Sequence, residues 1–338
     1  MAHISRRAFG VSALSASLLG LSACGGEKKD DKKMAAEGGA DNQSSGSWPR
    51  TIKHEKGELT LKAQPKRIVS TAITATGTLL AIGAPVVASA ATTVSPLTND
   101  KGFFKQWAKV AEERKVEVLY PNLEFNMEAL IAADPDLVIV SKTGRDSVAD
   151  HFDEIAAKFP AVLIDYTPLT WQELAGKLAE MTGHEEGAKK ALETYDARVK
   201  EVSSQITVPA GGASVVSFNG AGKEEGIGKP TGPHAQLLKG LGIEVKGAPE
   251  ELDKNSRRQR KDFAFVSFEN LSKAIQGETV FLIAANEKKA EKFVSEPTLA
   301  NLPAVQKKQV YPLGITSFRI DYYSGLLMVD AVGKALKK

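Results

Sequence analysis

The chain has 338 residues, of which 42% are hydrophobic and 25% charged, and its formal net charge is +3 at pH 7. A charge this close to balance argues against a nucleic-acid-binding surface. The single cysteine excludes an intrachain disulfide and a cysteine-rich metal site. The length is more than one hydrophobic core usually organises, so the chain is expected to form more than one lobe.

Residues 1–23 predict an export signal. Arg6 and Arg7 precede a short apolar run, and Leu21-Ser22-Ala23 stands directly before Cys24. This order is typical of a secretory signal rather than of a membrane span, which needs ~20 apolar residues. It is also typical of bacterial lipoproteins, so Cys24 is the expected lipidation site. Lipid on Cys24 would anchor the exported protein to the outer face of the cell membrane. The two arginines also resemble a twin-arginine signal, which leaves the export route open.

Residues 24–47 are rich in Gly, Ser, Lys, Asp and Glu, a composition that predicts a flexible tether. From residue 48 the composition is that of a globular protein. Apolar runs then alternate with helical patterns, which predicts an N-terminal lobe (48–168) built on a parallel sheet. The strands are expected at 67–71, 86–90, 116–120, 137–140 and 161–165, and the helices around 79–82 and at 103–115, 127–133 and 148–159.

Residues 169–207 predict bridging helices, at 171–181 and 185–206, and the second is long, amphipathic and free of Gly and Pro after Gly187. A second alternation predicts a C-terminal lobe (208–338). Its strands are expected at 214–218, 243–245, 263–266, 279–284 and 310–311, and its helices at 235–241, 287–294 and from 321 onward. The predicted fold class is α/β, with two Rossmann-like lobes, each a mostly parallel sheet with flanking helices, joined by one long bridging α-helix. Open α/β sheets bind ligands outside the carboxyl ends of their strands, so a ligand is expected in the cleft between the lobes.

Five segments resemble those of a known family. They are PKRIVST (65–71), LLAIGAPV (79–86), QWAKVAEERK (106–115), LPAVQ (302–306) and FRIDYYS (318–324). Together they are similar to the iron-siderophore-binding lipoproteins of ABC transporters, in the helical-backbone class of periplasmic binding proteins. The resemblance implies a receptor, expected to be monomeric, that captures a ferric catecholate siderophore of the enterobactin type. It would deliver this cargo to an ABC permease in the plasma membrane, with no catalysis and no cofactor apart from the lipid on Cys24.

The chemistry of such a cargo predicts the kind of side chain that binds it. A ferric tris-catecholate carries three negative charges and its iron is saturated by six oxygens, so no protein ligand to the metal is expected. Arginine is suited to it because the guanidinium is permanently charged, planar and able to stack on rings. Arg319 is the first candidate, with a structural alternative of helix capping or pairing with Asp321. The other candidates are Arg260, which aligns with a family arginine, and Arg257, Tyr322 and Lys229.

Two glutamates are candidates for docking to the permease. By resemblance, Glu128 is the docking residue of the N-terminal lobe and Glu269 that of the C-terminal lobe. Both fall in an expected first helical turn, where the helix dipole alone favours a carboxylate by ~0.3–1 kcal/mol.

Other cargoes and another class of function stay open. The family tryptophan between 218 and 233 and the family arginine near 94–99 have no counterpart here, so a hydroxamate siderophore, haem or cobalamin are alternatives. A bare metal ion is disfavoured because the histidines are isolated in sequence. An enzyme is the remaining alternative, but the segment 226–231 lacks the residues of a phosphate-binding loop.

Overall fold

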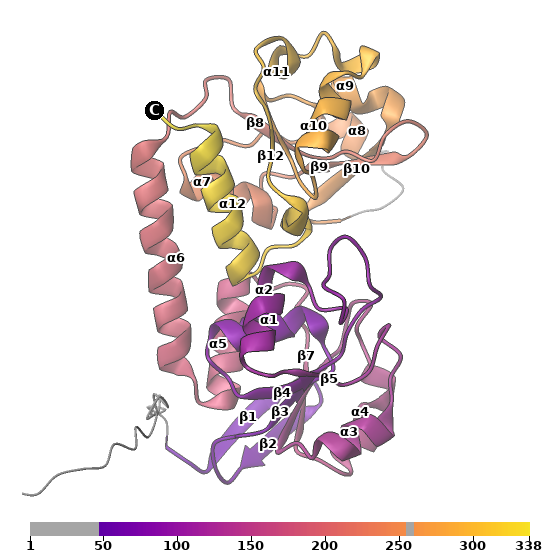
Figure 1. The fold of residues 1–338 in the computed structure, drawn as a ribbon, viewed down its shortest axis with the longest axis vertical. Helices are drawn as coiled ribbons and strands as arrows, with labels where there is room; N and C mark the ends of the chain where they lie inside the picture. Colours follow the sequence, from indigo (N-terminus) through magenta and orange to yellow (C-terminus); the bar gives the residue numbers. More distant parts are fainter. Residues whose placement is uncertain (1–46, 255–259) are drawn as a thin grey trace, which may run out of the picture. The chain divides into compact units, whose positions relative to one another are not determined.

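The computed structural model describes residues 47–254 and 260–338. These residues contain two five-stranded sheets and a two-stranded hairpin, and helices pack around both large sheets (Figure 1). Within the same residues, no helix is both long enough and apolar enough to cross a bilayer. Several predicted features lie outside the described residues: the signal (1–23), Cys24, nearly all of the tether (24–47) and Arg257.

The N-terminal sheet is parallel throughout, in the strand order β5-β4-β3-β6-β7. Strands β3, β6 and β7 are buried along their whole length, as expected of apolar parallel strands covered on both faces. The strands are β3 (Ile68–Ser70), β4 (Val86–Ser89), β5 (Glu117–Val118), β6 (Leu137–Ser141) and β7 (Ala161–Ile164). The helices are α1 (Ile73–Ala81), α2 (Lys105–Glu113), α3 (Met127–Ala133), η1 (Ala149–His151) and α4 (Phe152–Ala156). The single helix predicted at 148–159 is therefore wrong in extent, because a 3-10 turn precedes a short α4.

The C-terminal sheet is mixed, in the strand order β10-β9-β8-β11-β12. Strands β8, β11 and β12 are parallel, whereas β9 pairs antiparallel with both β8 and β10. The strands are β8 (Ala213–Ser217), β9 (Glu224–Gly228), β10 (Phe263–Ser267), β11 (Thr279–Leu282) and β12 (Val310–Pro312). The helices are α7 (Pro233–Gly240), α8 (Glu250–Lys254), η2 (Phe268–Asn270), α9 (Leu271–Ala274), α10 (Glu287–Val294), η3 (Pro297–Leu299), α11 (Pro303–Gln306), η4 (Ile315–Phe318) and α12 (Tyr322–Ala335). The predicted α/β class, with two mostly parallel sheets, is confirmed.

The strands differ from the sequence predictions in three places. The hairpin of β1 (Arg50–His54) and β2 (Gly57–Leu61) was not predicted, because its charged residues hide the alternation of apolar positions. Strand β9 was not predicted either, since glycines are rare in strands. Here Gly228 permits close pairing, because a Cβ on it would lie 2.9 Å from the Cβ of Val215. The strand predicted at 243–245 is wrong: only an isolated bridge joins Val245 to Ala213.

Two helices connect the sheets. Helix α5 (Trp171–Thr182) begins with a capping box formed by Thr170 and Glu173, and it ends at Gly183, whose positive φ of 72° suits glycine. Helix α6 (Glu185–Gln205) runs without interruption for 21 residues, close to its predicted extent. Its buried side chains face α5 and α12, and Figure 1 shows α12 alongside it. The predicted long connecting helix is confirmed.

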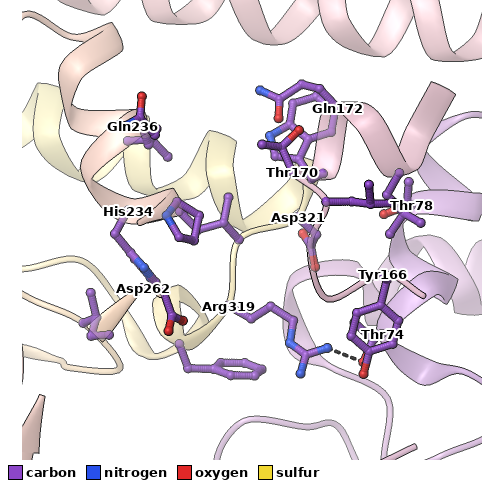
Figure 2. Close-up of a pocket in the computed structure, with 18 of the residues that line it drawn as sticks. Thr74, Thr78, Tyr166, Thr170, Gln172, His234, Gln236, Asp262, Arg319 and Asp321 are labelled. Carbon is purple, nitrogen blue, oxygen red and sulfur yellow. Dashed lines mark hydrogen bonds between the residues drawn. The ribbon is translucent and has the colours of Figure 1, made fainter. Parts of the chain in front are cut away.

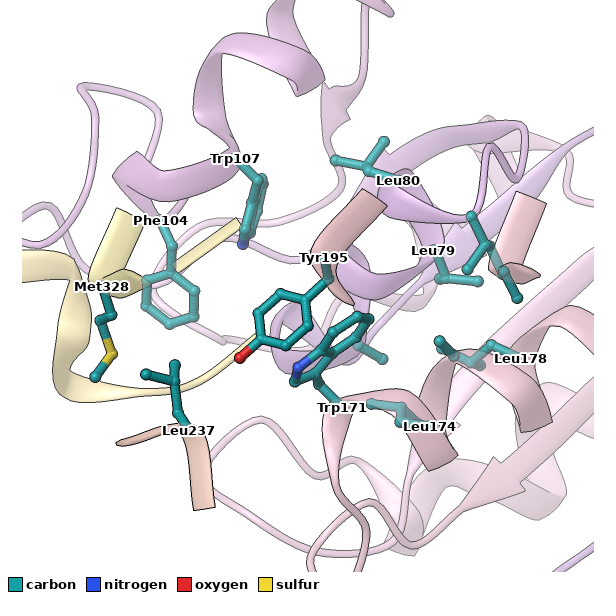
Figure 3. Close-up of a cluster of buried hydrophobic side chains, with 14 of the residues drawn as sticks. Leu79, Leu80, Phe104, Trp107, Trp171, Leu174, Leu178, Tyr195, Leu237 and Met328 are labelled. Carbon is teal, nitrogen blue, oxygen red and sulfur yellow. The ribbon is translucent and has the colours of Figure 1, made fainter. Parts of the chain in front are cut away.

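One hydrophobic core extends across the junction of the two lobes (Figure 3). The ring of Trp171 lies 5.1 Å from that of Tyr195 on α6 and 5.7 Å from that of Tyr322 on α12, measured between centroids. Phe104, from the N-terminal lobe, packs on Phe318 at 5.2 Å. The segment that follows β12 is therefore packed against both α5 and the N-terminal lobe.

The start of α6 packs very closely on the end of α1, and a substitution at Gly187 tests this packing. A Cβ on Gly187 would lie 1.8 Å from the carbonyl oxygen of Ile82, so Gly187→Ala must displace backbone. We expect this substitution to lower the free energy of unfolding by about 1–3 kcal/mol. Gly176 in α5 is the matched control, because nothing lies within 4 Å of its Cβ position. Gly176→Ala should raise stability by about 0.5–1 kcal/mol. Urea unfolding measures both, and equal effects would contradict the close packing.

Candidate functional site

A cavity of about 810 Å³ lies between the two lobes. Part of its lining comes from α1, α5, α6 and the segment after β7, and part from β8, α7 and the segments after β11 and η4. Tyr166, Ser217 and Ile283 place the cavity at or just beyond the carboxyl ends of β7, β8 and β11. Ligand sites of open α/β sheets occur at such positions, so this cavity is the candidate binding site.

The guanidinium of Arg319 lies in this cavity (Figure 2). Its Cζ is 5.8 Å from the ring centroid of Phe104 and 6.0 Å from that of Tyr166, within range of a cation–π interaction. Its Nη1 donates a hydrogen bond to the hydroxyl of Thr74 on α1. The backbone of Arg319 is extended between η4 and α12, and its carbonyl accepts from Ser324. These contacts hold a cation from the C-terminal segment against the N-terminal lobe.

Arg260 also lines the cavity, but it has a carboxylate partner. Its Nε and Nη2 donate to the two oxygens of Asp262, at 2.8 and 2.5 Å. Its Cζ lies 5.9 Å from the ring centroid of Phe265. The Arg260 side chain is 56% exposed, so this second cation lies at the rim rather than in the depth of the cavity.

Two further sequence candidates do not line the cavity. The ring of Tyr322 packs at 5.7 Å from that of Trp171 and at 5.1 Å from that of Tyr323, on the core side of α12. Lys229 follows β9 and forms an ion pair with Asp253 of α8, at 2.9 Å. The structure thus brings Arg319 and Arg260 to one cavity and leaves Tyr322 and Lys229 outside its lining.

Carboxylates also contribute to the cavity lining, which the sequence did not indicate. Asp321 is 4% exposed and caps α12, accepting from the Ser324 amide at 2.8 Å and from Gln106 of the N-terminal lobe at 3.0 Å. Burial raises the pKa of Asp321, although the hydrogen bonds from Ser324 and Gln106 and the nearby Arg319 act in the opposite direction. Asp262 is paired with Arg260, and Asp196 on α6 is exposed.

His234 is a buried residue in the wall formed by α7. Its Nε2 is 2.7 Å from the carbonyl oxygen of Ser317, and because a carbonyl only accepts, Nε2 carries the hydrogen. Burial lowers the pKa of His234, which favours the neutral ring. Within the described residues, no group of three or more His, Cys, Asp or Glu side chains is arranged to hold a metal ion.

Sequence reasoning missed several polar residues of the cavity, namely Thr74, Tyr166, His234 and Asp262. Tyr166 follows the buried strand β7 by two residues, and Thr74 lies in the first turn after β3. Both positions are at carboxyl ends of parallel strands, a signal that could have identified them.

Glu128 and Glu269 lie in exposed first turns, one in each lobe. Glu128 follows the N-cap Asn126 of α3, whose side chain accepts from the amide of Ala129 at 3.0 Å. Glu269 lies in η2, between β10 and α9. Hydrogen bonds from its own amide and from Ser267 lower the pKa of Glu269, so its carboxylate is charged at neutral pH. Neither glutamate lines the cavity.

Comparison with known proteins identifies relatives over most of the chain. A family model described as periplasmic binding protein matches residues 68–314. The chain is 40% identical over 291 residues to the ferric enterobactin-binding periplasmic protein FepB of Escherichia coli O6:H1, a match covering 86% of this chain and 91% of FepB. It is 26% identical over 233 residues to the iron(3+)-hydroxamate-binding protein FhuD of Bacillus subtilis, covering 68% of this chain and 67% of FhuD.

Solved structures agree with this assignment. The crystal structure of holo-ViuP superposes with a TM-score of 0.77 at 39% identity, covering 87% of this chain and 97% of ViuP. Staphylococcus aureus SirA complexed with staphyloferrin B superposes with a TM-score of 0.62 at 20% identity, covering 85% of this chain and 98% of SirA, a likeness in fold alone. Since the family model matches well over half of the sequence and FepB aligns along most of its own length, this chain belongs to the periplasmic binding protein family.

Proposed function

We propose that this protein is the extracytoplasmic solute-binding component of an ABC importer and that its cargo is a ferric catecholate siderophore of the enterobactin type. The observation that carries the proposal is Arg319, a permanent cation held beside two aromatic rings in the interlobe cavity. The 40% identity to a ferric enterobactin-binding protein supports the same cargo. The protein binds and releases this cargo without converting it.

The cavity chemistry suits a planar, anionic chelate. The catecholate rings can stack against Tyr166 and the Arg319 guanidinium, while the catecholate oxygens accept from the free N–H groups of that guanidinium. Arg260 is a second cation at the rim, and the cargo would compete with Asp262 for it. The six catecholate oxygens already fill the coordination of the iron, so the protein recognises the chelate through charge and stacking.

A hydroxamate siderophore is the second candidate cargo. The observation that favours it is the 26% identity to the hydroxamate-binding FhuD over two thirds of that protein. A ferric tris-hydroxamate core carries no net charge, so it would gain little from the cation of Arg319.

The proposal extends to the rest of the chain. Lipid on Cys24 anchors the protein to the outer face of the cell membrane, behind a tether at 24–47. The binding unit is a monomer with an N-terminal lobe (48–168), bridging helices (169–207) and a C-terminal lobe (208–338). The exposed Glu128 and Glu269 dock it to the permease, one through each lobe.

Tryptophan fluorescence of the purified chain in detergent tests the cargo. Trp171 lines the cavity, so a ferric catecholate should quench the emission saturably, more strongly than a ferric hydroxamate, haem or cobalamin. Trp171→Phe should remove most of the quenching. Trp48→Phe is the matched control and should retain it, because Trp48 is outside the cavity lining. If another ligand of the panel quenches the emission saturably and catecholates do not, the proposed cargo is wrong and that ligand takes its place.

A further inference from the structure

A buried carboxylate lies one layer behind the wall of the cavity. Asp146, in the segment after β6, is 4% exposed and does not line the cavity itself. One of its oxygens accepts from the backbone amide of Thr74 at 2.8 Å, and the other accepts from the hydroxyl of Tyr166 at 2.6 Å. Thr74 and Tyr166 both line the cavity, so Asp146 connects two neighbouring parts of its wall.

The hydrogen bonds around Asp146 form a directed chain that ends on Arg319. The guanidinium donates to the Thr74 hydroxyl, this hydroxyl donates to the Tyr166 oxygen at 3.3 Å, and Tyr166 donates to Asp146. Figure 2 shows Arg319, Thr74 and Tyr166 side by side, with the Arg319–Thr74 bond dashed. Burial and the nearby Asp146 raise the pKa of Tyr166, so the phenol keeps the proton that it donates.

The backbone is shaped around this chain. Gly144 has a φ of +93°, a conformation that favours glycine. A Cβ at this position would lie 1.8 Å from the Tyr166 hydroxyl oxygen and 2.8 Å from a carboxylate oxygen of Asp146. The absence of a side chain at 144 is therefore what allows Tyr166 to reach Asp146.

The two cavity arginines differ in how their charge is balanced. The N–H groups of Arg260 bind both oxygens of Asp262 directly. In the described part of the chain, no carboxylate lies within ion-pair distance of Arg319, whose hydrogen bond to protein goes to the neutral Thr74 hydroxyl. Asp321 interacts with Arg319 through space, whereas Asp146 is linked to it through the hydroxyl groups of Thr74 and Tyr166. Most of the guanidinium N–H groups therefore stay available to a ligand.

We propose that Asp146 is a positioning residue for ligand binding: through Thr74 and Tyr166 it fixes the Arg319 guanidinium across the lobe junction. This inference rests on the proposed function, because the role of Asp146 is defined by its effect on the binding of an anionic cargo. An arginine that is fixed before binding loses less side-chain freedom when the ligand arrives, and preorganisation of this kind raises affinity. Asp146 itself touches no ligand.

The test is a double-mutant cycle on the full chain in detergent, with ferric catecholate titrated against tryptophan emission. Asp146→Asn should weaken binding about tenfold in the native background, the scale of a lost charged hydrogen bond. Tyr166→Phe should weaken it about fivefold, because the ring stays while the hydrogen bonds of its hydroxyl to Thr74 and Asp146 are lost. In the Arg319→Ala background, neither substitution should weaken binding further.

Tyr195→Phe is the matched control, since Tyr195 also lines the cavity but lies on α6, outside the chain of hydrogen bonds. Its effect should be the same in both backgrounds. If Asp146→Asn and Tyr166→Phe also act equally in both, these residues act independently of Arg319 and the inference is overturned, while the cargo proposal stands. If the native chain binds no anionic chelate, the proposed function fails and the inference fails with it. Tyr166→Phe keeps the test decisive if Asp146→Asn does not fold.

Discussion

Replacing Arg319 with alanine should weaken the binding of a ferric catecholate at least tenfold, which is about 1.4 kcal/mol of binding free energy. The cargo carries three negative charges, and a unit charge pair 4 Å apart is worth ~4 kcal/mol at an effective dielectric constant of 20. The observed loss should be smaller than that value, because water and Arg260 partly replace the missing charge. The same substitution should have little effect on a ferric hydroxamate, whose core is neutral.

The measurement is the dissociation constant, obtained by fluorescence titration of each variant. Arg198→Ala is the matched control: Arg198 on α6 is paired with Glu201 and Asp330 and is outside the cavity lining, so affinity should not change. The deficit of Arg319→Ala should shrink as salt is added, since screening weakens the native interaction. If Arg319→Ala binds the ferric catecholate as tightly as the native chain, Arg319 does not contribute to cargo binding.

Reversing the charge of both Glu128 and Glu269 should abolish transport and leave cargo binding intact. Both side chains are exposed and neither lines the cavity, so the ligand affinity of Glu128→Arg/Glu269→Arg should equal that of the native chain. The docking proposal pairs these two carboxylates with cations of the permease, so docking would be lost when both become cations themselves. Like charges brought together at an interface cost several kcal/mol.

Uptake of iron-labelled catecholate into vesicles that hold the permease measures this effect, and we expect it to fall at least tenfold. The matched control is Glu124→Arg/Glu291→Arg, which reverses one exposed glutamate in each lobe outside the proposed docking positions. This control should retain uptake. Full uptake by the Glu128 and Glu269 double variant would show that docking uses another surface.

The sequence predicted those parts of the fold that depend on local patterns. The apolar runs at β3, β6 and β7 and the uninterrupted pattern of α6 each identify one element, because burial on both faces or along one stripe is visible in the residues themselves. Strand β9 was invisible because Gly226 and Gly228 lower strand propensity, and only its pairing with β8 and β10 forms it. The pairing of β9 with β10 joins segments that are far apart in the sequence, so it is a tertiary effect.

For the candidate site too, some residues were predicted from the sequence and others were not. Arg319 and Arg260 were found from residue chemistry and resemblance, and both reach the cavity. Tyr322 was chosen by its place in the chain and Lys229 for its charge, and neither criterion shows the direction of a side chain. Tyr322 faces the core, and Lys229 pairs with Asp253. Asp146 gave no signal, because its role depends on Thr74 and Tyr166, which are 72 and 20 residues away.

The packing of Trp171 with Tyr195 and Tyr322, and of Phe104 with Phe318, has a mechanical consequence. Side chains from both lobes pack into one hydrophobic core. Closely packed side chains resist sliding past one another, so the core resists movement of one lobe against the other. A large rotation of one lobe would separate the side chains of this shared core. We therefore expect cargo to enter and leave the cavity through small displacements of the lobes.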